Sequence, residues 1–435
     1  MATRRDFLKK MGFSALALPT LAEQVVSNPQ VILDQLRSTL RMPLLPAEGD
    51  PQFWIKIREQ FMLARDSAFF NTGTLGATPR VVVARMVEHL HFVASHIAEW
   101  DYSGHGGMIS GYAPMVELRI KIAQLLGADV KEISLTENVT AAMSYIANGL
   151  DLARGDEILA SNQEHPGGRS AWLVKEKRGG VTYREVPLPK PAHSPEEILE
   201  VVTKAFRKET RVLVLSHVIT GSGAILPVKE ICAAAKSRGI FTVLDGAQAV
   251  GQVPVALHDI ACDAYVGCFH KWILAPAGNG FLYLRREQAE KIWTTLASSE
   301  WANHQDDGFR FTQRGTGSLT LLLGLEAALD FHAKIGHEKI LARIKYLGNC
   351  LRDGLRKIKK VKIYSPSDEN MCAGITVYNI EGWTGPRLQE EFWKRGRLRP
   401  RSSSEIYGLR HSTHIYNSPE EIERSLGIVR DLAGS

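Results

Sequence analysis

Short apolar runs rich in β-branched residues alternate along the chain with segments of helical pattern. The runs lie at residues 132–135, 157–160, 211–215, 241–244 and 264–267. Between two of them, residues 227–238 place apolar side chains on one helix face with a period of 3.6 residues; these are Val228, Ile231, Cys232 and Ala235. Short strands that alternate with helices at this spacing predict βαβ units and a largely parallel sheet.

Polar residues follow each of the apolar runs. They occupy positions 136–140, 162–168, 216–217, 245–248 and 268–271. Ligands of parallel sheets bind beyond the carboxyl ends of the strands, so a site is expected at these positions. One polar residue after a strand often only caps a helix or a turn, but polar residues after successive strands predict a ligand site.

The residue types at these strand ends indicate pyridoxal phosphate. Lys271 could form a Schiff base with an aldehyde, and Asp245 could hold a protonated ring nitrogen. His165 could stack on a ring, while hydroxyl and backbone N–H groups at the helix start near Val139 and Thr140 could bind a phosphate. The sequence contains no GxxxxGK[ST], HExxH or GxSxG motif, and it lacks the third glycine of a dinucleotide fingerprint after 221–223.

Composition and charge narrow the class of protein. The 435 residues suffice for two or three domains, and 44% hydrophobic with 23% charged residues is typical of a globular protein. The net charge of +6 is spread along the chain without a dense basic block, so we expect no nucleic-acid partner. The five cysteines form no CxxC pair, so neither a disulfide framework nor a metal site is predicted.

The first residues are typical of a twin-arginine export signal. Arg4 and Arg5 precede an apolar stretch at 11–18, and small residues up to Ala22 could be recognised by a signal peptidase. The stretch is shorter than the ~20 residues that span a bilayer, and charges interrupt every later apolar run. We therefore expect a periplasmic protein without a membrane partner after signal removal. A basic, slightly amphipathic first helix is the alternative.

Short motifs recur in a fixed order from the end of the N-terminal segment to the C-terminal region. They lie at residues 71–77, 136–140, 164–166, 216–218, 245–248, 270–272, 314–316 and 410–412. Their order and spacing resemble those of the class V aminotransferase family of fold type I pyridoxal phosphate enzymes. The His-Lys-Trp triplet at 270–272 and the Asn-Thr-Gly opening at 71–73 are most similar to its isopenicillin N epimerase-like branch, beside the cysteine desulfurase-like one.

The resemblance implies how the cofactor ring would be held. Lys271 would attach the cofactor and then move protons at the substrate carbon, unless it is only a surface lysine. Asp245 would pair with the ring nitrogen, and Gln248 would hydrogen-bond the ring oxygen. His165 would stack on the ring face, or else only cap the helix that starts at Pro166.

The resemblance also implies sites for the phosphate and the substrate. Val139, Thr140 and His270 would bind the phosphate. Thr316 would reach it from the neighbouring subunit, so a homodimer with shared active sites is the expected unit. Arg410, together with Asn71, would bind the carboxylate of a small amino-acid-like substrate; the alternative is that Arg410 only starts a surface strand.

Two features of the chain depart from the family pattern. Cysteine desulfurases need a thiol ahead of the carboxylate-binding arginine, whereas residues 394–407 contain none, so persulfide chemistry is not expected. Cys372 precedes a strand-like run and is predicted to lie in the core. The arginines at 395, 397, 399 and 401 alternate, so in an extended loop they would share one face, either toward an acidic or peptide-like substrate or toward solvent.

The expected fold follows from the resemblance. A signal at 1–22 and a segment at 23–77 would precede a large cofactor domain at 78–330, built on a mostly parallel seven-stranded sheet, and a smaller α+β domain at 331–435. The expected activity is that of a class V aminotransferase. Amino-acid epimerisation, elimination of a C–S or other β substituent, and a non-catalytic binding role are the alternatives.

Overall fold

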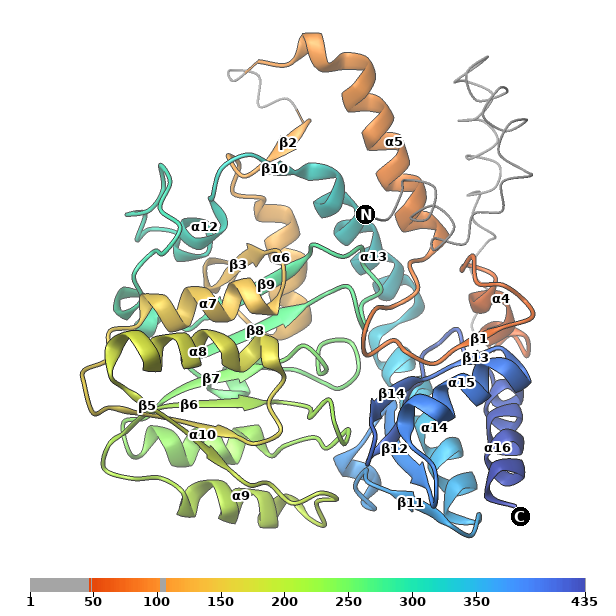
Figure 1. Cartoon of the computed structure of the whole chain (residues 1–435). Helices are drawn as coiled ribbons and strands as arrows, with labels where there is room; N and C mark the ends of the chain where they lie inside the picture. The colour runs from red at the N-terminus through yellow and green to blue at the C-terminus, as the bar shows by residue number, and fades with distance from the viewer. Residues whose placement is uncertain (1–46, 48, 102–106, 435) are drawn as a thin grey trace, which may run out of the picture. The chain divides into compact units, whose positions relative to one another are not determined.

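The computed structural model describes residues 47, 49–101 and 107–434 (Figure 1). The predicted export signal at 1–22 lies outside the described residues, as does most of the segment predicted at 23–77. No helix of the described part is long and apolar enough to cross a bilayer.

A seven-stranded sheet forms the centre of the larger part of the chain. In spatial order its strands are β3 (Ile133–Thr136), β9 (Gly280–Leu284), β8 (Ala264–Cys268), β7 (Phe241–Asp245), β6 (Thr210–Ser216), β4 (Glu157–Ser161) and β5 (Thr182–Val186). The run from β8 to β5 is parallel, and only β9 runs against its neighbours. The predicted mostly parallel, seven-stranded α/β sheet is therefore confirmed.

The predicted runs correspond to β3, β4, β6, β7 and β8, and two strands were missed. The edge strand β5 carries charged residues and is partly exposed, so its pattern is not that of a buried strand. The strand β9 is wholly buried, and a short apolar run of this kind can also belong to a helix.

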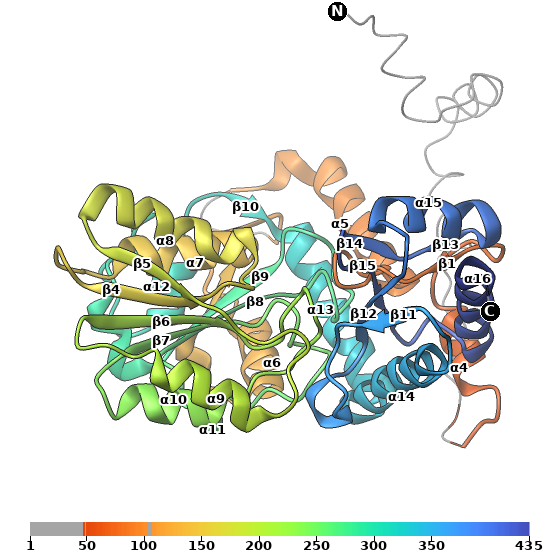
Figure 2. The same cartoon turned by 60° about the horizontal axis from the view of Figure 1, so that its bottom comes forward.

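Helices cover both faces of this sheet. Figure 2 shows α7 (Val139–Gly149) and α8 (Pro166–Gly179) on one face, with α9 (Pro195–Lys204) and α10 (Val228–Lys236) on the other. Successive residues of β6 alternate between the two cores: Val212 and Val214 pack with α7, while Leu213 and Leu215 pack with α10. The helix predicted at 227–238 is α10, and its predicted apolar residues are all buried.

A second, antiparallel sheet forms near the C-terminus. Its order is β11 (Val361–Ile363), β12 (Ile375–Ile380), β15 (Gly408–Ser412) and β14 (Arg401–Ser404), with β14 at one edge. The helices α14 (His337–Arg356), α15 (Gly385–Gly396) and α16 (Pro419–Ala433) pack with it around a separate apolar cluster. The predicted boundary at 330 falls within α13 (Leu319–Ile335), so the division at that residue stays a prediction.

Further helices and two short strands complete the described part of the chain. They are α4 (Phe53–Arg58), α5 (Arg80–His96), η1 (Ile97–Glu99), β2 (Ile109–Ser110), α6 (Val116–Leu126), η2 (Val130–Glu132), α11 (Leu257–Ile260), η3 (Arg286–Lys291), α12 (Asp307–Thr312), β10 (Gly317–Ser318) and η4 (Glu369–Met371).

One segment near the N-terminus joins the two sheets. Its strand β1 (Ala68–Phe69) pairs in parallel with β13 (Leu398–Arg399), and Asn71 then bridges to Ser412 at the end of β15. Farther on, the Gly76 N–H donates to the His270 carbonyl at 2.8 Å. A Cβ at Gly76 would lie only 2.2 Å from the Lys271 carbonyl oxygen, so this close approach requires glycine.

Candidate active site

Asp245 lies buried at the carboxyl end of β7. Its Oδ1 accepts a hydrogen bond from the Ala247 N–H at 2.8 Å. Its Oδ2 faces the first turn of α8, where a Cβ at Gly168 would come within 2.9 Å of it. Burial raises the pKa of the Asp245 carboxyl, while Ala247, Lys271 and His165 act against the rise. A cationic group at this carboxylate would therefore be strongly favoured.

Lys271 follows β8 in a tight turn. The Leu274 N–H donates to the Lys271 carbonyl, and Leu274 is buried with a left-handed φ of 62°. A left-handed leucine is a strained conformation, of the kind that packing maintains at functional sites. The Lys271 ammonium has no hydrogen-bond or ion-pair partner in the described part of the chain, and its charge lowers the pKa values of His165, Asp245 and His270.

His165 is the N-cap of α8. Its Nδ1 accepts from the Gly167 N–H at 3.1 Å, so Nε2 carries the proton in the neutral ring. The capping alternative is thus realised, and because the hydrogen bond lies in the ring plane, it orients the ring without using its faces. Although part of the ring is exposed, the surrounding protein lowers its pKa by desolvation, and Lys271 adds to this effect.

The start of α7 presents donors for an anion. The Asn138 side chain caps the Ala141 N–H at 3.0 Å, whereas the N–H groups of Val139 and Thr140 precede the first intrahelical bonds. Thr140 Oγ1 lies close to Gly167, where a Cβ would be 2.7 Å away.

His270 adds a buried, unpaired nitrogen to the turn before Lys271. Its Nδ1 has no hydrogen-bond partner among the described residues, and burial followed by Lys271 lowers its pKa to about 4. A neutral, orphaned imidazole nitrogen fits a hydrogen bond to a phosphate. Cys268, two residues earlier, is buried, and its thiol lies 3.9 Å from the Ala247 carbonyl.

Gln248 connects three parts of the site. Its Oε1 accepts from Trp272 Nε1 at 2.9 Å, and its Nε2 donates to the Gly73 carbonyl at 2.8 Å and to Thr220 Oγ1 at 3.2 Å. Both amide protons are therefore in use. The predicted hydrogen bond to the ring oxygen requires that one of these partners be exchanged, and it stays a prediction.

Arg410 is buried on β15 among neutral groups. Its Nη1 donates to Thr220 Oγ1 at 2.6 Å, and its Nη2 donates to Asn71 Oδ1 and Thr74 Oγ1, each at 3.0 Å. Its Nε is buried without a partner in the described part, and no described carboxylate forms an ion pair with the guanidinium. Burial and then Arg401 lower its pKa to about 9. The structure thus brings Arg410 and Asn71 together, and it leaves the cation ready for an anionic ligand.

Thr316 lies apart from this group. It is exposed, and its Oγ1 hydrogen-bonds Tyr112 Oη at 3.1 Å. It lines a pocket of about 250 Å³ together with Arg314 and Glu137. No hydrogen bond of the described residues joins it to Val139, Thr140 or His270, and its predicted role at the phosphate of the neighbouring subunit stays a prediction.

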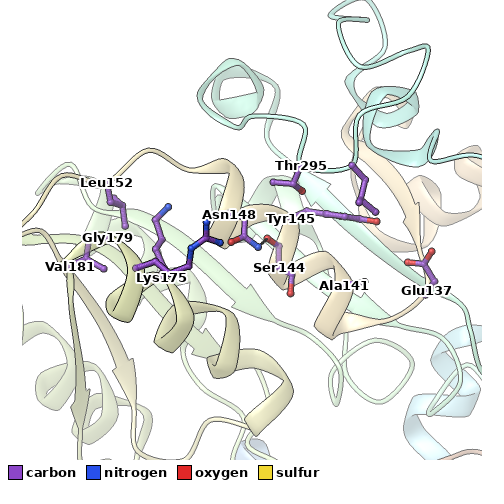
Figure 3. Close-up of a pocket in the computed structure, with 12 residues that line it drawn as sticks. Glu137, Ala141, Ser144, Tyr145, Asn148, Leu152, Lys175, Gly179, Val181 and Thr295 are labelled. Atoms are coloured by element: carbon purple, nitrogen blue, oxygen red, sulfur yellow. Dashed lines mark hydrogen bonds between the residues drawn. The ribbon is translucent and has the colours of Figure 1, made fainter.

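A larger pocket of about 900 Å³ lies on the outer side of α7 and α8 (Figure 3). Ser144, Tyr145 and Asn148 line it from α7 and Lys175 lines it from α8. None of the predicted cofactor residues line it. Glu137 belongs both to this pocket and to the one that contains Thr316.

The expectation that alternate arginines share one loop face is wrong. Arg395 lies in α15 and pairs with Glu391 at 2.7 Å, and Arg397 pairs with Asp66 at 3.1 Å. Arg399 lies 4.1 Å from the centre of the Trp393 ring. Only Arg401 reaches the site, where its Nη1 donates to Thr74 Oγ1 at 3.3 Å.

Sequence reasoning missed several residues that complete the site. Thr74, Thr220 and Trp272 provide the hydrogen bonds of Arg410 and Gln248. Thr74 and Trp272 lie inside motifs that carried the family resemblance, and Thr220 comes two residues after another, so proximity to a motif was the available signal. Cys372 is buried, as predicted.

Comparisons with known proteins agree with this geometry. The pattern of the class V aminotransferase family matches residues 69–424. The chain belongs to the class V aminotransferase family. It is 31% identical to isopenicillin N epimerase of Amycolatopsis lactamdurans over 401 residues, which cover 87% of this chain and 98% of that one. It is 27% identical to a probable cysteine desulfurase of Xylella fastidiosa over 92% of this chain and 100% of that one.

Solved structures share the fold. A cystine C-S lyase, C-DES, in complex with cysteine persulfide superposes with a TM-score of 0.76 at 24% identity, covering 84% of this chain and 98% of that one. A cysteine desulfurase from Thermococcus onnurineus gives a TM-score of 0.77 at 23% identity, covering 87% and 98%. The predicted fold type I architecture is confirmed, and pyridoxal phosphate, the cofactor of this family, fits the residues described above.

Glu164 lies buried behind Asp245. Ser161 Oγ donates to its Oε1 at 2.5 Å and Ser216 Oγ donates to its Oε2 at 2.6 Å. Burial, with a further contribution from Asp245, raises the pKa of this carboxyl from 4.5 to about 7. The folded protein therefore binds a proton here at pH values where the unfolded chain has lost it.

We predict that this carboxyl makes the fold less stable as the pH rises from about 4.5 to about 7. The pKa of Glu164 is higher in the folded protein than in the unfolded chain. The stabilisation that comes from its bound proton is therefore complete below the unfolded-state pKa, and it is lost as the pH rises through the folded-state pKa. Between pH 5 and pH 8, this carboxyl should lower the free energy of unfolding of the parent protein by on the order of 1–3 kcal/mol. In Glu164→Gln this part of the pH dependence should be absent. Urea unfolding at both pH values measures this decrease.

The exposed glutamate Glu287 provides the control. Glu287→Gln should keep the pH dependence of the parent chain. An equal dependence in Glu164→Gln and in the parent would show that Glu164 titrates normally.

Proposed function

We propose that this protein is a pyridoxal-phosphate-dependent aminotransferase that acts on a small amino acid or amino-acid-like substrate. The observation that carries the proposal is the buried Arg410 guanidinium, which has no carboxylate partner in the described part of the chain. A buried unpaired cation is costly, and the carboxylate of an amino acid would compensate that cost by a two-pronged hydrogen-bonded pair. Through Asn71, Thr74 and Thr220 this cation is joined to the residues around Lys271.

Each cofactor-facing residue then has a definite task. Bound pyridoxal phosphate supplies an acceptor for the electron pair that a broken bond leaves on the substrate α-carbon. Asp245 holds a proton at the ring nitrogen, and the N–H groups of Val139 and Thr140 with His270 bind the phosphate. Lys271 Nζ holds the cofactor and later takes the α-proton from the substrate. His165 supports the ring face.

Transamination suits the proton carriers around this space. It moves one proton between two carbons, and one lysine on one face can do this. Inversion at the α-carbon takes a second proton carrier on the opposite face. Among the described residues whose charges act on His165, Lys271 presents the only amine, and the imidazole of His165 itself is the other group here that can carry a proton. Epimerisation is the second candidate, and the 31% identity to an isopenicillin N epimerase favours it.

Persulfide transfer is not proposed. The hairpin of β14 and β15, which precedes and carries Arg410, contains serines at 402–404 and no cysteine. Four of the five cysteines are buried, and Cys350 lies in α14, away from the hydrogen-bonded network of Arg410.

We expect the purified protein with pyridoxal phosphate to show the visible absorption band of a lysine-bound cofactor. Lys271→Ala should abolish the band, because no other amine of the described residues is placed at the cofactor site. Lys175→Met removes another partly buried lysine, from α8, and should keep the band. Absorption spectra of the three proteins with and without L-amino acids measure this, and a band that survives Lys271→Ala would refute the proposal.

Products distinguish the reactions. Formation of a 2-oxo acid from an L-amino acid, dependent on an added 2-oxo acid acceptor, supports transamination. Release of the D-amino acid would show that the reaction is epimerisation and not transamination. Release of ammonia together with the β substituent would show that it is elimination.

The protein should be a homodimer in which Thr316 of each subunit completes the phosphate site of the other. Lys271→Ala and Thr316→Arg chains would each lack the band of the lysine-bound cofactor when they are alone. A 1:1 mixture that is unfolded and refolded together should recover about a quarter of the parent's cofactor band, since half of the dimers are hybrids and each hybrid has one intact site. No recovery in the mixture, or a single chain by light scattering, would refute the shared site.

Export through the twin-arginine pathway places the enzyme in the periplasm in this proposal, because Arg4, Arg5 and the apolar stretch at 11–18 have the layout of that signal. Residues 1–30 fused to a folded reporter should direct it to the periplasm. Arg4→Lys with Arg5→Lys should retain the reporter in the cytoplasm. Retention of the unaltered fusion, or export of the double variant, would refute this location.

A further inference from the structure

Arg401 lies directly opposite Arg410 in the small sheet. The two residues are Cα partners in the antiparallel pair of β14 and β15, so their side chains extend from the same face. Both guanidinium groups donate to the same oxygen, Thr74 Oγ1, at 3.3 and 3.0 Å. The two cations therefore converge on one point of the segment that joins the two sheets.

Arg401 also faces the cofactor side of this edge. Its charge lowers the pKa of the His165 imidazole, as do those of Lys271 and Arg410. β14 is an edge strand of its sheet (Figure 1), and Arg401 on it is exposed. Arg401 is therefore the more exposed of the two cations, whereas Arg410 is buried.

Neither of the two arginines forms an ion pair in the described part of the chain, although their neighbours do. Arg395 pairs with Glu391 and Arg397 pairs with Asp66. Arg399 has a ring partner, Trp393. Opposed like charges destabilise an antiparallel pair, and burial of Arg410 increases that cost. One substrate carboxylate neutralises only one of the two cations.

We propose that Arg401 binds a second acidic group of the substrate, so that the site selects amino acids with a carboxylate at the end of the side chain. The α-carboxylate lies on buried Arg410, and the distal carboxylate lies on the more exposed Arg401. This inference rests on the proposed function for the assignment of Arg410. It narrows the substrate to dicarboxylic amino acids or to compounds that present the same two charges.

Charge and size can be separated with matched amino acids. L-glutamate and L-glutamine have nearly the same shape and differ in the charge of the distal group, and L-aspartate with L-asparagine provides a shorter pair. L-2-aminoadipate with L-norleucine extends the range to a longer side chain. Apparent dissociation constants are obtained for the cofactor-loaded protein from the shift of its visible absorption band, independently of turnover.

In the parent protein, the best dicarboxylic amino acid should bind about tenfold more tightly than its neutral counterpart. Arg401→Gln should weaken the dicarboxylic ligand about tenfold and change the neutral one less than about twofold. Arg401→Lys should restore part of the preference, because it keeps the charge but not the planar fork. Arg399→Gln removes the same charge from a side chain stacked on Trp393, and it should leave the preference unchanged.

Failure of this inference is distinguishable from failure of the proposed function. Arg401 does not select a second acid if neutral and dicarboxylic amino acids bind the parent protein with equal dissociation constants. The same conclusion holds if Arg401→Gln weakens the binding of both classes equally. If no amino acid shifts the band of a protein that binds pyridoxal phosphate through Lys271, the proposed function itself is wrong. If Arg399→Gln and Arg401→Gln lower the preference for dicarboxylic amino acids equally, the preference depends only on the net charge of the protein. That result would overturn the assignment of Arg401 to the distal carboxylate.

Discussion

A buried positive charge without an internal counter-ion is the constraint on which this site depends. Arg410 is kept in place by Asn71 and Thr74 from the N-terminal segment, and by Thr220 from the loop after β6. Three neutral oxygens satisfy its donors in part but do not neutralise the charge, and its Nε stays unpaired among the described residues. The protein thus holds a cation in a place where only an anionic ligand removes the electrostatic cost.

The same segment that partners Arg410 also sets the position of the cofactor residues. Gly73 lies so close to the network that a Cβ would be 2.9 Å from Ser412 Oγ and 3.1 Å from both Arg410 Nη2 and Gln248 Oε1. Gly76 binds the His270 carbonyl three residues later. The segment therefore couples the carboxylate-binding side of the site to the turn that carries Lys271, and a side chain at either glycine would force the two apart.

Relatives with different chemistries share this framework, so the fold alone does not choose the reaction. The likeness to isopenicillin N epimerase and to cysteine desulfurases covers most of the chain. What differs is local. The hairpin before Arg410 carries serines and Arg401 and contains no cysteine, so the thiol nucleophile that persulfide chemistry needs is absent from it.

The local sequence pattern was sufficient to predict five strands of the large sheet and the helix α10. It also predicted the strand-end residues Asp245, His165 and Lys271. Alternation, helical period and the end of a parallel strand are properties of short stretches of sequence, so they can be recognised without the tertiary structure. The family motifs added Arg410 and Asn71, whose direct contact the structure then showed. Arg395 to Arg401 could not be interpreted in this way, since a helix end and a change of backbone direction at Arg397 separate side chains that alternate in sequence. The pairing of Arg401 with Arg410, the role of Thr220 and the distance of Thr316 from the other predicted residues depend on strand register and on contacts between residues far apart in the chain. Those are decided by the packing of the whole domain, and no short stretch of sequence contains them.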